Sequence, residues 1–351
     1  MICRVCKAVY EKAREGTRCP EDAALLVDAD TLAAHPNDVL LGAVVAEEFG
    51  IVGILGRGAF GTVYRAIQFP ILRVVALKVL HFQYYENDEV RQRFFSEARA
   101  LAALTDPSVV TLIRYGEQKA GVPLAGSPGF LYIAQEYVRG RTLRAVIAEE
   151  APLVPERAID LTLQILSGLA EAHRVGIVHR DLKPPNVIVV PGELGGERVK
   201  VLDFGIAKLL ADDLLQEGSP TTQSGLAMGT PDYMAPEQTD SRLADARADI
   251  YSLGVILFEM LMGRKPYVAP THFLVMAAHR DAPLPPLEGL EDAPAGLQAV
   301  VHRALAKSPE LRFVSAVEMA EGLEALEASI TMDGQPPEWL AEHLSEGPPR
   351  G

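Results

Sequence analysis

The pattern of hydrophobic positions changes near residue 49 and again near Pro155. The first of these stretches contains short runs of β-branched and aromatic residues, which predict strands around a glycine-rich turn. The predicted strands cover 51–55, 62–66 and 74–80, then segments near 109–117, 130–138 and 143–147. Between them, 88–104 has apolar residues at helical spacing, so we expect a strand-rich lobe with one helix.

After Pro155 the apolar spacing becomes helical, first over 156–175 and later up to about residue 328. A short β patch at 187–190 and 199–202 interrupts the helices, and a Gly-, Ser- and Thr-rich loop covers about 206–229. The order of elements predicts an α+β fold with a β-rich first lobe and a helical second lobe, not a doubly wound sheet. The cleft between two such lobes is the expected ligand site.

Changes in composition and hydrophobic pattern divide the chain into three parts. We expect a separate cysteine-containing segment at 1–46, a main domain at 47–325 and a flexible acidic tail at 326–351. Within the main domain, the first lobe is expected at about 47–138 and the second at about 139–325.

Charge and composition argue against several classes of function, including nucleic-acid binding and membrane insertion. The 351 residues carry a net charge of −14, which argues against binding nucleic acid phosphates or anionic lipid. No apolar run reaches the roughly 18 residues of a membrane helix, and the N-terminus lacks a signal-peptide core. Three cysteines, all before residue 20, form no disulfide framework. We therefore expect a soluble cytoplasmic protein with reduced thiols.

Residues 56–63 (GRGAFGTV) form a glycine-rich turn between two predicted strands. Glycines allow a backbone to approach phosphates closely, although an ordinary hairpin explains this turn equally well. Further along, Lys78 lies on an apolar strand and Glu97 on the amphipathic helix. These two could pair to hold phosphates, or Lys78 could extend to the surface and Glu97 could be solvated.

The strongest signal is the run HRDLKPPN at 179–186, followed by DFG at 203–205 and APE at 235–237. With the glycine-rich turn and VALK at 75–78, these motifs resemble those of the eukaryotic-type protein kinases. The resemblance covers about residues 47–325 and is closest to the bacterial serine/threonine kinases, especially over 307–319. It implies a two-lobed protein kinase fold, with ATP and magnesium as cofactors and proteins as substrates.

The resemblance also implies a role for each matched residue. Gly56, Gly58 and Gly61 would cover the phosphates of ATP. Lys78 would hold the α- and β-phosphates and pair with Glu97. Asp181 would accept or orient the substrate hydroxyl proton, Lys183 would neutralise charge on the γ-phosphate, and Asn186 and Asp203 would hold magnesium. The remaining implied nucleotide contacts are Arg57, Val63, Ala76, and the hinge residues Glu136 and Val138, with Gln135 at the gatekeeper position.

Two features resemble serine/threonine rather than tyrosine kinases: Lys183 two residues after Asp181, and Thr230 before the APE motif. Arg180 beside the catalytic aspartate requires an anion, which a phosphorylated loop could supply with help from Lys208. By resemblance, Thr222 and Ser224 are the expected autophosphorylation sites, although they could simply be polar loop residues. The run RGRT at 139–142 lacks an acidic residue, so we expect no requirement for basic residues upstream of the target site.

The cysteines of the first segment form a separate pattern. Cys3 and Cys6, then Cys19 and Asp22, resemble half a zinc ribbon followed by a degraded second half. Zinc accepts three thiolates with a carboxylate or an imidazole, so Asp22 or His35 could be the fourth ligand. The alternatives are a decayed ribbon that binds nothing or a small apolar cluster. We expect a docking or sensing role, such as contact with a partner or a second copy of the chain.

Two other classes of function compete with an active kinase. A pseudokinase would keep the fold as a binding scaffold, but Lys78, Glu97, Asp181, Asn186 and Asp203 are all present. A small-molecule kinase would keep similar catalytic residues but would lack the APE motif and the Gly-Thr that precedes it. An active serine/threonine protein kinase therefore remains the leading interpretation.

Overall fold

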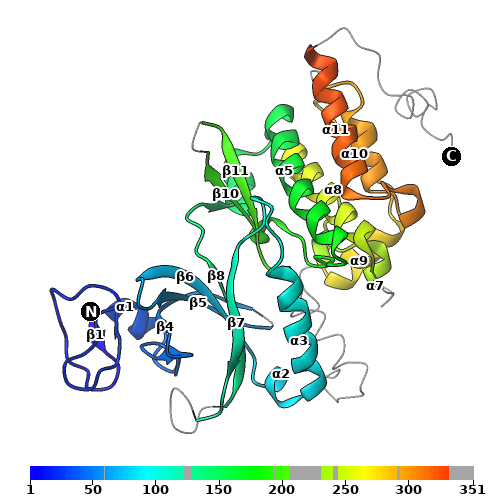
Figure 1. Cartoon of the computed structure of the whole chain (residues 1–351). Coiled ribbons are helices and arrows are strands. Elements are labelled where there is room, and N and C mark those ends of the chain that lie inside the picture. Colours follow the sequence, from blue (N-terminus) through cyan, green and yellow to red (C-terminus); the bar gives the residue numbers. More distant parts are fainter. Residues whose placement is uncertain are drawn as a thin grey trace. The chain divides into compact units, whose positions relative to one another are not determined.

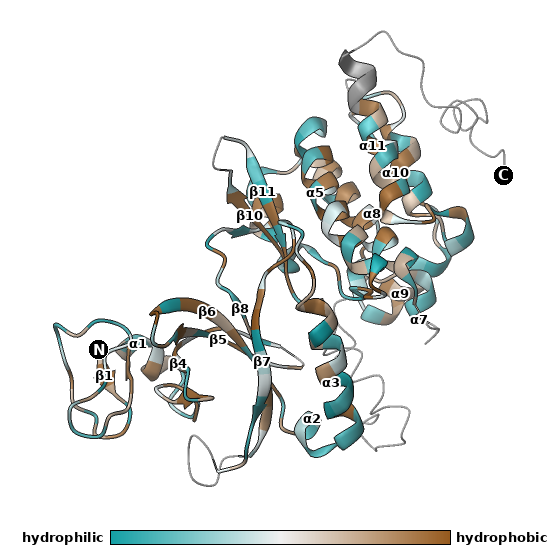
Figure 2. Cartoon of the chain, viewed as in Figure 1, coloured by the Kyte–Doolittle hydropathy of each residue, from teal (hydrophilic) through white to brown (hydrophobic). Residues whose placement is uncertain are grey.

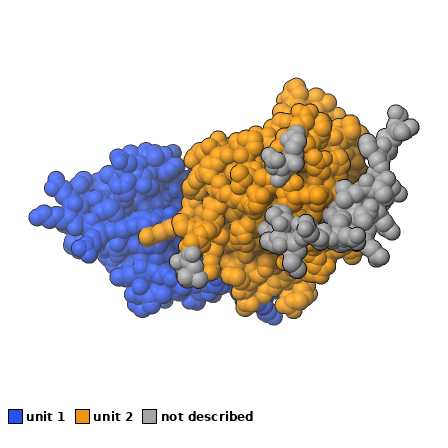
Figure 3. Space-filling model, turned by 90° about the horizontal axis from the view of Figure 1, so that it is seen from above, with its two compact units in different colours: residues 1–103, 111–137, 206–226 blue, residues 104–110, 138–205, 227–351 orange. Residues whose placement is uncertain are grey.

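The computed structural model describes residues 1–58, 60–121, 128–192, 195–204, 231–239, 244–290 and 293–331 (Figure 1). The chain forms two compact units, coloured separately in Figure 3. Unit 1 contains Met1–Ala103 and Thr111–Tyr137, and unit 2 contains Leu104–Val110, Val138–Gly205 and the chain from Ala227 onward.

Unit 1 is built on a six-stranded antiparallel sheet in the order β3-β4-β5-β6-β8-β7. The β-branched runs form strands because side chains on one face pack into a common core, which includes Val75, Leu77 and Val79. The predicted strands near 51–55, 62–66, 74–80 and 130–138 and the helix near 88–104 are confirmed. The strands are β3 (Val44–Val45), β4 (Phe49–Gly58), β5 (Gly61–Gln68), β6 (Arg73–Leu80), β7 (Leu112–Gln118) and β8 (Phe130–Glu136), and the helices are α2 (Gln83–Glu86) and α3 (Asp88–Leu101).

Unit 2 is mainly helical, and its core is formed around α5 and α8. Buried residues recur along α5 at spacings of three and four, as its sequence predicts, and Figure 2 shows both hydrophobic and hydrophilic residues along this helix. A three-stranded sheet in the order β11-β10-β9 completes the unit. Its elements are β9 (Arg141–Thr142), β10 (Val187–Pro191), β11 (Glu197–Val201), α4 (Leu143–Glu150), α5 (Pro155–Arg174), α7 (Pro236–Thr239), α8 (Ala246–Met262), α9 (His272–Asp281), α10 (Leu297–Ala304), α11 (Ala316–Thr331), and the 3-10 turns η1 (Pro184–Asn186), η3 (Pro231–Tyr233) and η4 (Pro309–Leu311).

The strand expected at 143–147 is wrong, because these residues begin α4. Thr142 caps this helix by accepting a hydrogen bond from the Ala145 amide at 3.2 Å. Leu143, Val146 and Ile147 are buried, and their spacing of three and four residues is that of a helix.

Helix α8 has buried residues on every side, including Asp249. Its largely apolar sequence is that of a central core helix. In the part of the chain that the structure describes, no helix combines the length and apolar character needed to cross a bilayer.

The first segment does not pack separately. It contributes β1 (Ile2–Cys3), β2 (Leu26–Val27), α1 (Ala29–Ala34) and β3. Val27, Leu32, Leu41 and Val45 share the core of the large sheet with Phe49. One hydrophobic core therefore contains residues from both sides of the boundary expected at residue 46, and the boundary itself stays a prediction.

Unit 2 buries a neutral histidine, which makes its stability depend on pH. The Nε2 of His279 lies 3.0 Å from the carbonyl oxygen of Asp232 and must donate to it, so Nδ1 accepts from the Tyr251 hydroxyl at 2.9 Å. Burial, with a further contribution from the Lys307 charge, lowers the pKa of His279 to about 4. The unfolded chain protonates this residue near its ordinary pKa of about 6.5, so stability is lost as pH falls from 6.5 towards 4.

We expect this histidine to contribute about 2–3 kcal/mol to the loss of unfolding free energy between pH 7.5 and 4.5. Urea unfolding of His279→Gln should show a correspondingly smaller pH dependence, while the exposed His272→Gln serves as control. Equal pH slopes for both variants and the wild type would contradict the assignment.

Candidate active site

The glycine-rich turn joins β4 to β5 in unit 1. Gly56 pairs with Val63, and Gly58 pairs with Gly61. At Gly61 an added Cβ would lie 2.1 Å from the carbonyl oxygen of Val79, so the local packing requires glycine. At Gly56 an added Cβ would meet no described atom within 4 Å. The fold does not demand a glycine there, whereas the close approach of a phosphate would.

Several predicted nucleotide contacts share one face of the sheet. Val63 lies opposite Lys78, and Ala76 lies opposite Gln135 in the neighbouring strand. Because Ala76 and Lys78 are two residues apart on β6, their side chains point to the same side. The other side of β6 carries the core residues of unit 1. The lysine lies on the side where Ile133, its partner on β8, packs with residues of α3 in a second core.

Glu97 lies in the middle of α3, next to the buried Ala98. Its pairing with Lys78 stays a prediction. Of the hinge residues, Glu136 ends β8, and its carboxylate accepts a hydrogen bond from the Thr111 amide at 2.9 Å. Val138 begins the first long segment of unit 2 after this strand.

The catalytic loop at 179–186 is held in place by hydrogen bonds to Asp249 of α8. The Asp249 carboxylate is fully buried and accepts hydrogen bonds from the amides of His179 at 2.7 Å and Arg180 at 2.8 Å. It also lies 2.8 Å from Nε2 of His173. Arg180 has a φ of 61°, a costly conformation for a residue with a side chain. The buried carboxylate holds the two amides around this strained residue.

Asp181, Lys183 and Asn186 are brought together by this loop. Lys183 Nζ lies 2.7 Å from Oδ2 of Asp181, and the Asn186 side-chain amide donates to the Asp181 carbonyl at 2.9 Å. The Asn186 carbonyl accepts from the Leu202 amide at 2.8 Å, which places Asp203 one residue further along. In the described part of the chain, Oδ1 of Asp181 accepts no hydrogen bond. A carboxylate with one oxygen held and one available suits a general base.

Behind these residues, the loop is anchored by buried aromatic and polar contacts. His179 is fully buried, and its Nε2 lies 2.9 Å from the Leu202 carbonyl oxygen. Its ring centroid is 4.9 Å from that of Phe204. Asp203 has a φ of 54°, so its backbone is turned at the point where a metal-ligating carboxylate is predicted.

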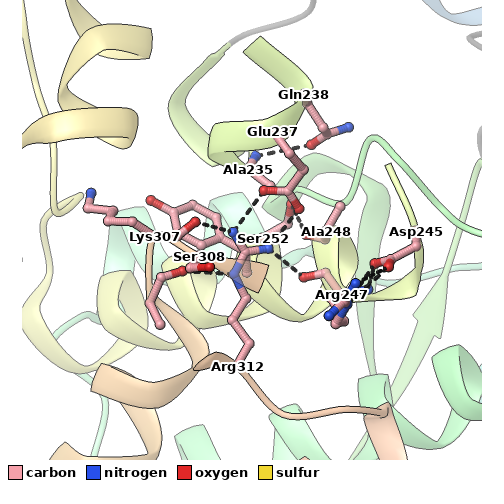
Figure 4. A network of polar contacts seen from close by, with 12 residues as sticks. Ala235, Glu237, Gln238, Asp245, Arg247, Ala248, Ser252, Lys307, Ser308 and Arg312 are labelled. Atoms are coloured by element: carbon pink, nitrogen blue, oxygen red, sulfur yellow. Dashed lines mark hydrogen bonds and ion pairs between the residues drawn. The ribbon is translucent and has the colours of Figure 1, made fainter. Parts of the chain in front are cut away.

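The APE motif is held by a buried arginine (Figure 4). Arg312 is 1% exposed and donates from both terminal nitrogens to the Glu237 carboxylate at 2.7 and 2.8 Å. The next residue, Gln238, donates to the Arg180 carbonyl at 3.0 Å and accepts from the Ala235 amide at 3.0 Å. The motif is thereby joined to the catalytic loop.

Two supporting residues were missed by the sequence reasoning: His173, which contacts Asp249, and Gln238, which contacts the backbone of Arg180. No motif distinguishes them from ordinary helix residues. Conversely, Gly205, Lys208, Thr230 and the predicted phosphorylation sites Thr222 and Ser224 lie outside the described residues.

Unit 1 also contains a cluster of metal-ligating side chains. Cys3, Cys6, Cys19 and Asp22 bring one ligand atom each within 4.8 Å of one another. His35 does not belong to the cluster and instead ends α1. The alternative in which His35 is the fourth ligand is therefore wrong.

The kinase motifs can now be compared with known proteins. Residues 49–320 match the protein kinase domain family. The serine/threonine-protein kinase pkn3 of Myxococcus xanthus is 35% identical over 83% of this chain and 52% of its own length. PknB of Mycobacterium tuberculosis is 37% identical over 84% of this chain and 44% of its own length. The chain thus spans about half the length of the curated relatives it matches.

A solved structure agrees with this match. The crystal structure of the Mycobacterium tuberculosis PknI kinase domain has 28% sequence identity and a TM-score of 0.58, covering 81% of this chain and 97% of that one. The strand-rich and helical units confirm the predicted α+β kinase fold. Fold, motifs and relatives agree, and the chain belongs to the protein kinase domain family.

Proposed function

We propose that the chain transfers the γ-phosphate of ATP to serine or threonine hydroxyls of protein substrates. One observation carries this proposal: Asp181, Lys183 and Asn186 are assembled on a loop that the buried Asp249 fixes. Phosphoryl transfer depends mainly on positioning and on neutralising charge. The pseudokinase alternative is not favoured, because no catalytic position has been replaced.

In the proposed reaction, Oδ1 of Asp181 orients the substrate hydroxyl and accepts its proton. Lys183 stabilises negative charge on the transferred phosphoryl group. In unit 1, the glycine-rich turn and Lys78 bind the phosphates of ATP. The relatives named as serine/threonine kinases support hydroxyl substrates of this type.

Asn186 and Asp203 would hold magnesium. An amide oxygen and a carboxylate are the hard oxygen ligands that this ion prefers, so the donor set fits. Magnesium, when bound, neutralises charge on the phosphates. The chain orients these two ligands through the Asn186–Leu202 backbone bond and the turned backbone at Asp203.

The proposed function includes regulation by autophosphorylation, a cellular location and binding partners. Arg180 would bind a phosphate placed on Thr222 or Ser224 by autophosphorylation, which would order the loop. The protein would act in the cytoplasm, without nucleic acid or membrane partners. A docking partner or second copy would bind through the first segment.

The test is incubation of the purified protein with magnesium and radiolabelled ATP. We expect label on phosphoserine or phosphothreonine in the wild type and in Lys119→Met, an exposed lysine control in unit 1. Lys78→Met should lose labelling, because the phosphates lose their cation. Label on phosphotyrosine, or equal labelling of Lys78→Met, would refute the proposal.

A further inference from the structure

Residues 3–8 and 19–24 form two turns of the same geometry in unit 1. In the first, the Lys7 amide donates to the Cys3 carbonyl at 3.0 Å, and the Cys3 amide donates to the Ala8 carbonyl at 2.9 Å. In the second, Ala23 and Cys19 repeat the first bond at 3.0 Å, and Cys19 and Ala24 repeat the other at 2.7 Å. The fifth residue of each turn has a positive φ, 65° at Lys7 and 60° at Ala23.

This repetition assigns a structural role to the aspartate. Cys6 is the fourth residue of the first turn, and Asp22 is the fourth residue of the second. The Asp22 carboxylate therefore occupies the position that a second thiol occupies in the first turn. The second turn therefore has the backbone geometry of the first, with a carboxylate in place of a thiol at its fourth position.

The four ligand atoms have separations close to those of a tetrahedral zinc site. The Sγ atoms of Cys6 and Cys19 are 3.6 Å apart, and Sγ of Cys3 lies 3.1 Å from Oδ2 of Asp22. Zn–S bonds of about 2.3 Å and Zn–O bonds of about 2.0 Å give ligand separations of roughly 3.5–3.8 Å. All four atoms lie within 4.8 Å of one another, so small shifts would close the shell.

The surroundings of the cluster also fit a metal. The Val5 amide lies 3.3 Å from Sγ of Cys3, the Ala24 amide donates to Oδ1 of Asp22 at 3.0 Å, and the Tyr10 hydroxyl lies 3.3 Å from Sγ of Cys19. Such contacts orient metal ligands. Basic side chains outnumber acidic ones over residues 4–21, which favours a negatively charged loaded site. The basic residues are Arg4, Lys7, Lys12, Arg14 and Arg18, and the acidic ones are Glu11, Glu15 and Glu21.

The apolar core around these turns is very small. Its buried members are Cys3, Cys19 and Leu26. A core of this size cannot stabilise a fold without an additional constraint such as a metal ion. A metal would thus supply much of the folding energy of these turns.

The next strand joins the cluster to the main sheet of unit 1. On β2, Leu26 packs against the cysteines, whereas Val27 belongs to the core of the large sheet. The Leu25 amide donates to the Gly42 carbonyl at 3.1 Å, and the Gly42 amide donates to the Ile51 carbonyl on β4 at 2.9 Å. One short segment therefore contacts both the metal ligands and the strand that leads to the glycine-rich turn.

Asp38, which lies between β2 and Gly42 in the sequence, makes an ion pair with the glycine-rich turn. Asp38 is 8% exposed, and its carboxylate accepts hydrogen bonds from Nη2 of Arg57 at 2.6 Å and from the Tyr64 hydroxyl at 3.1 Å. Arg57 stands between Gly56 and Gly58. The glycine-rich turn is thus tied to a residue that follows α1.

We propose that Cys3, Cys6, Cys19 and Asp22 bind one zinc ion, and that this ion keeps residues 24–42 folded so that Asp38 holds the glycine-rich turn through Arg57. Binding forms three Zn–S bonds and one Zn–O bond, and each cysteine thiol releases its proton to solvent. A turn that is already held loses less conformational entropy when it binds phosphates. This last consequence rests on the proposed function, because it assumes that the turn binds ATP.

The metal site is tested by the zinc content of the full chain purified under reducing conditions. We expect one zinc per chain, and a cobalt-substituted protein with the charge-transfer absorption of thiolate ligands. Cys6→Ser and Asp22→Asn should weaken zinc binding about tenfold or more, Asp22→Cys should retain it, and the neighbouring Glu21→Gln should leave it unchanged. Reduced wild-type protein without stoichiometric zinc, or isolated protein with a Cys6–Cys19 disulfide, would overturn the proposal.

The connection to the glycine-rich turn is tested by hydrogen exchange of the full chain with and without a zinc chelator. We expect removal of zinc to accelerate exchange about tenfold in peptides covering 24–42 and 50–64, while α5 and α8 are unaffected. Arg57→Ala should keep its zinc and accelerate exchange only in 50–64. Unchanged exchange in 50–64 after zinc removal would disprove the connection.

The affinity for a fluorescent ATP analogue separates this proposal from the proposed function. Removal of zinc should weaken binding about 3- to 10-fold in the wild type and should have little further effect in Arg57→Ala. If the zinc-loaded chain binds no nucleotide, yet zinc content and exchange behave as expected, the proposed function fails and the zinc site stands. If nucleotide binds equally with and without zinc, the predicted gain in affinity fails.

Discussion

Asp181→Asn is expected to lower kcat by about 10²- to 10⁴-fold, the usual contribution of a general base. The asparagine amide has the same shape as the carboxylate, but it cannot accept the proton of the substrate hydroxyl. Lys183, whose Nζ lies 2.7 Å from Oδ2 of Asp181 in the wild type, also loses its negatively charged partner. The measurement is the steady-state rate of peptide phosphorylation at saturating ATP.

The structure offers a matched control for this variant. Asp160 is exposed on α5 and accepts a hydrogen bond from Gln164 at 3.0 Å, so Asp160→Asn should leave kcat unchanged. The amides of His179 and Arg180 are held by Asp249 and not by the Asp181 carboxylate. Asp181→Asn should therefore keep the thermal stability of the wild type. A loss of rate explained by unfolding, or a rate within threefold of the wild type, would contradict the role assigned to Asp181.

Most of the fold could be predicted from the chain because its strands are long enough for β-branched runs to be recognised. The exception, 143–147, is a short stretch of four apolar residues and Arg144, and such a stretch fits either period. The capping hydrogen bond that the Thr142 side chain accepts from the Ala145 amide, and the burial of Leu143, Val146 and Ile147, favour a helix. Local patterns do not reveal this burial, since it depends on the rest of unit 2.

The cysteine segment shows a second limit of sequence reasoning. Its composition differs from that of the following strands, which suggested a separate piece ending at residue 46. Its apolar side chains nevertheless complete the core around Phe49. The choice between Asp22 and His35 was also open in the sequence, because both are chemically suitable ligands. The repeated turn geometry, which depends on backbone hydrogen bonds, favours Asp22.

In the candidate active site, the motifs predicted which residues lie close together more successfully than which residues hold them in place. Asp181, Lys183 and Asn186 are close in the chain, so their proximity follows from one short loop. His173 and Gln238 lie on separate helices, and only tertiary packing brings them to the loop. The pairing of Lys78 with Glu97 likewise depends on how α3 lies against the sheet, which no local motif determines.

The residue with the largest expected effect on stability is Arg312. Besides Glu237, it donates to the carbonyls of Ala306 at 2.8 Å, Arg247 at 3.0 Å and Lys307 at 3.0 Å. Arg312→Met would leave the largely buried Glu237 without its partner and three carbonyls without this donor. Breaking a buried ion pair from one side costs about 3–5 kcal/mol, so we expect a loss of this size in urea unfolding.

Two variants identify the cause of that loss. Arg312→Lys keeps the charge but cannot make the two parallel bonds, so it should recover only part of the stability. Arg141→Met removes an exposed ion pair with Glu149 and Glu150 and should cost less than about 1 kcal/mol. A loss below 1 kcal/mol for Arg312→Met would show that the buried pair contributes no more than this surface pair.

The same substitution should also reduce catalysis, because the arginine acts on the catalytic loop through a chain of contacts. Arg312 fixes Glu237, Gln238 follows directly, and its side chain donates to the carbonyl of Arg180, the residue before Asp181. Arg312→Met should therefore lower kcat at a temperature where the variant is still folded. Gln238→Leu provides the comparison, since it removes the side-chain contacts with Arg180 and the Ala235 amide but leaves the Arg312–Glu237 pair in place. It should lower kcat with a smaller loss of stability. If Arg312→Met lowers stability and leaves kcat of the folded protein unchanged, the APE motif supports the fold of unit 2 without influencing the catalytic loop.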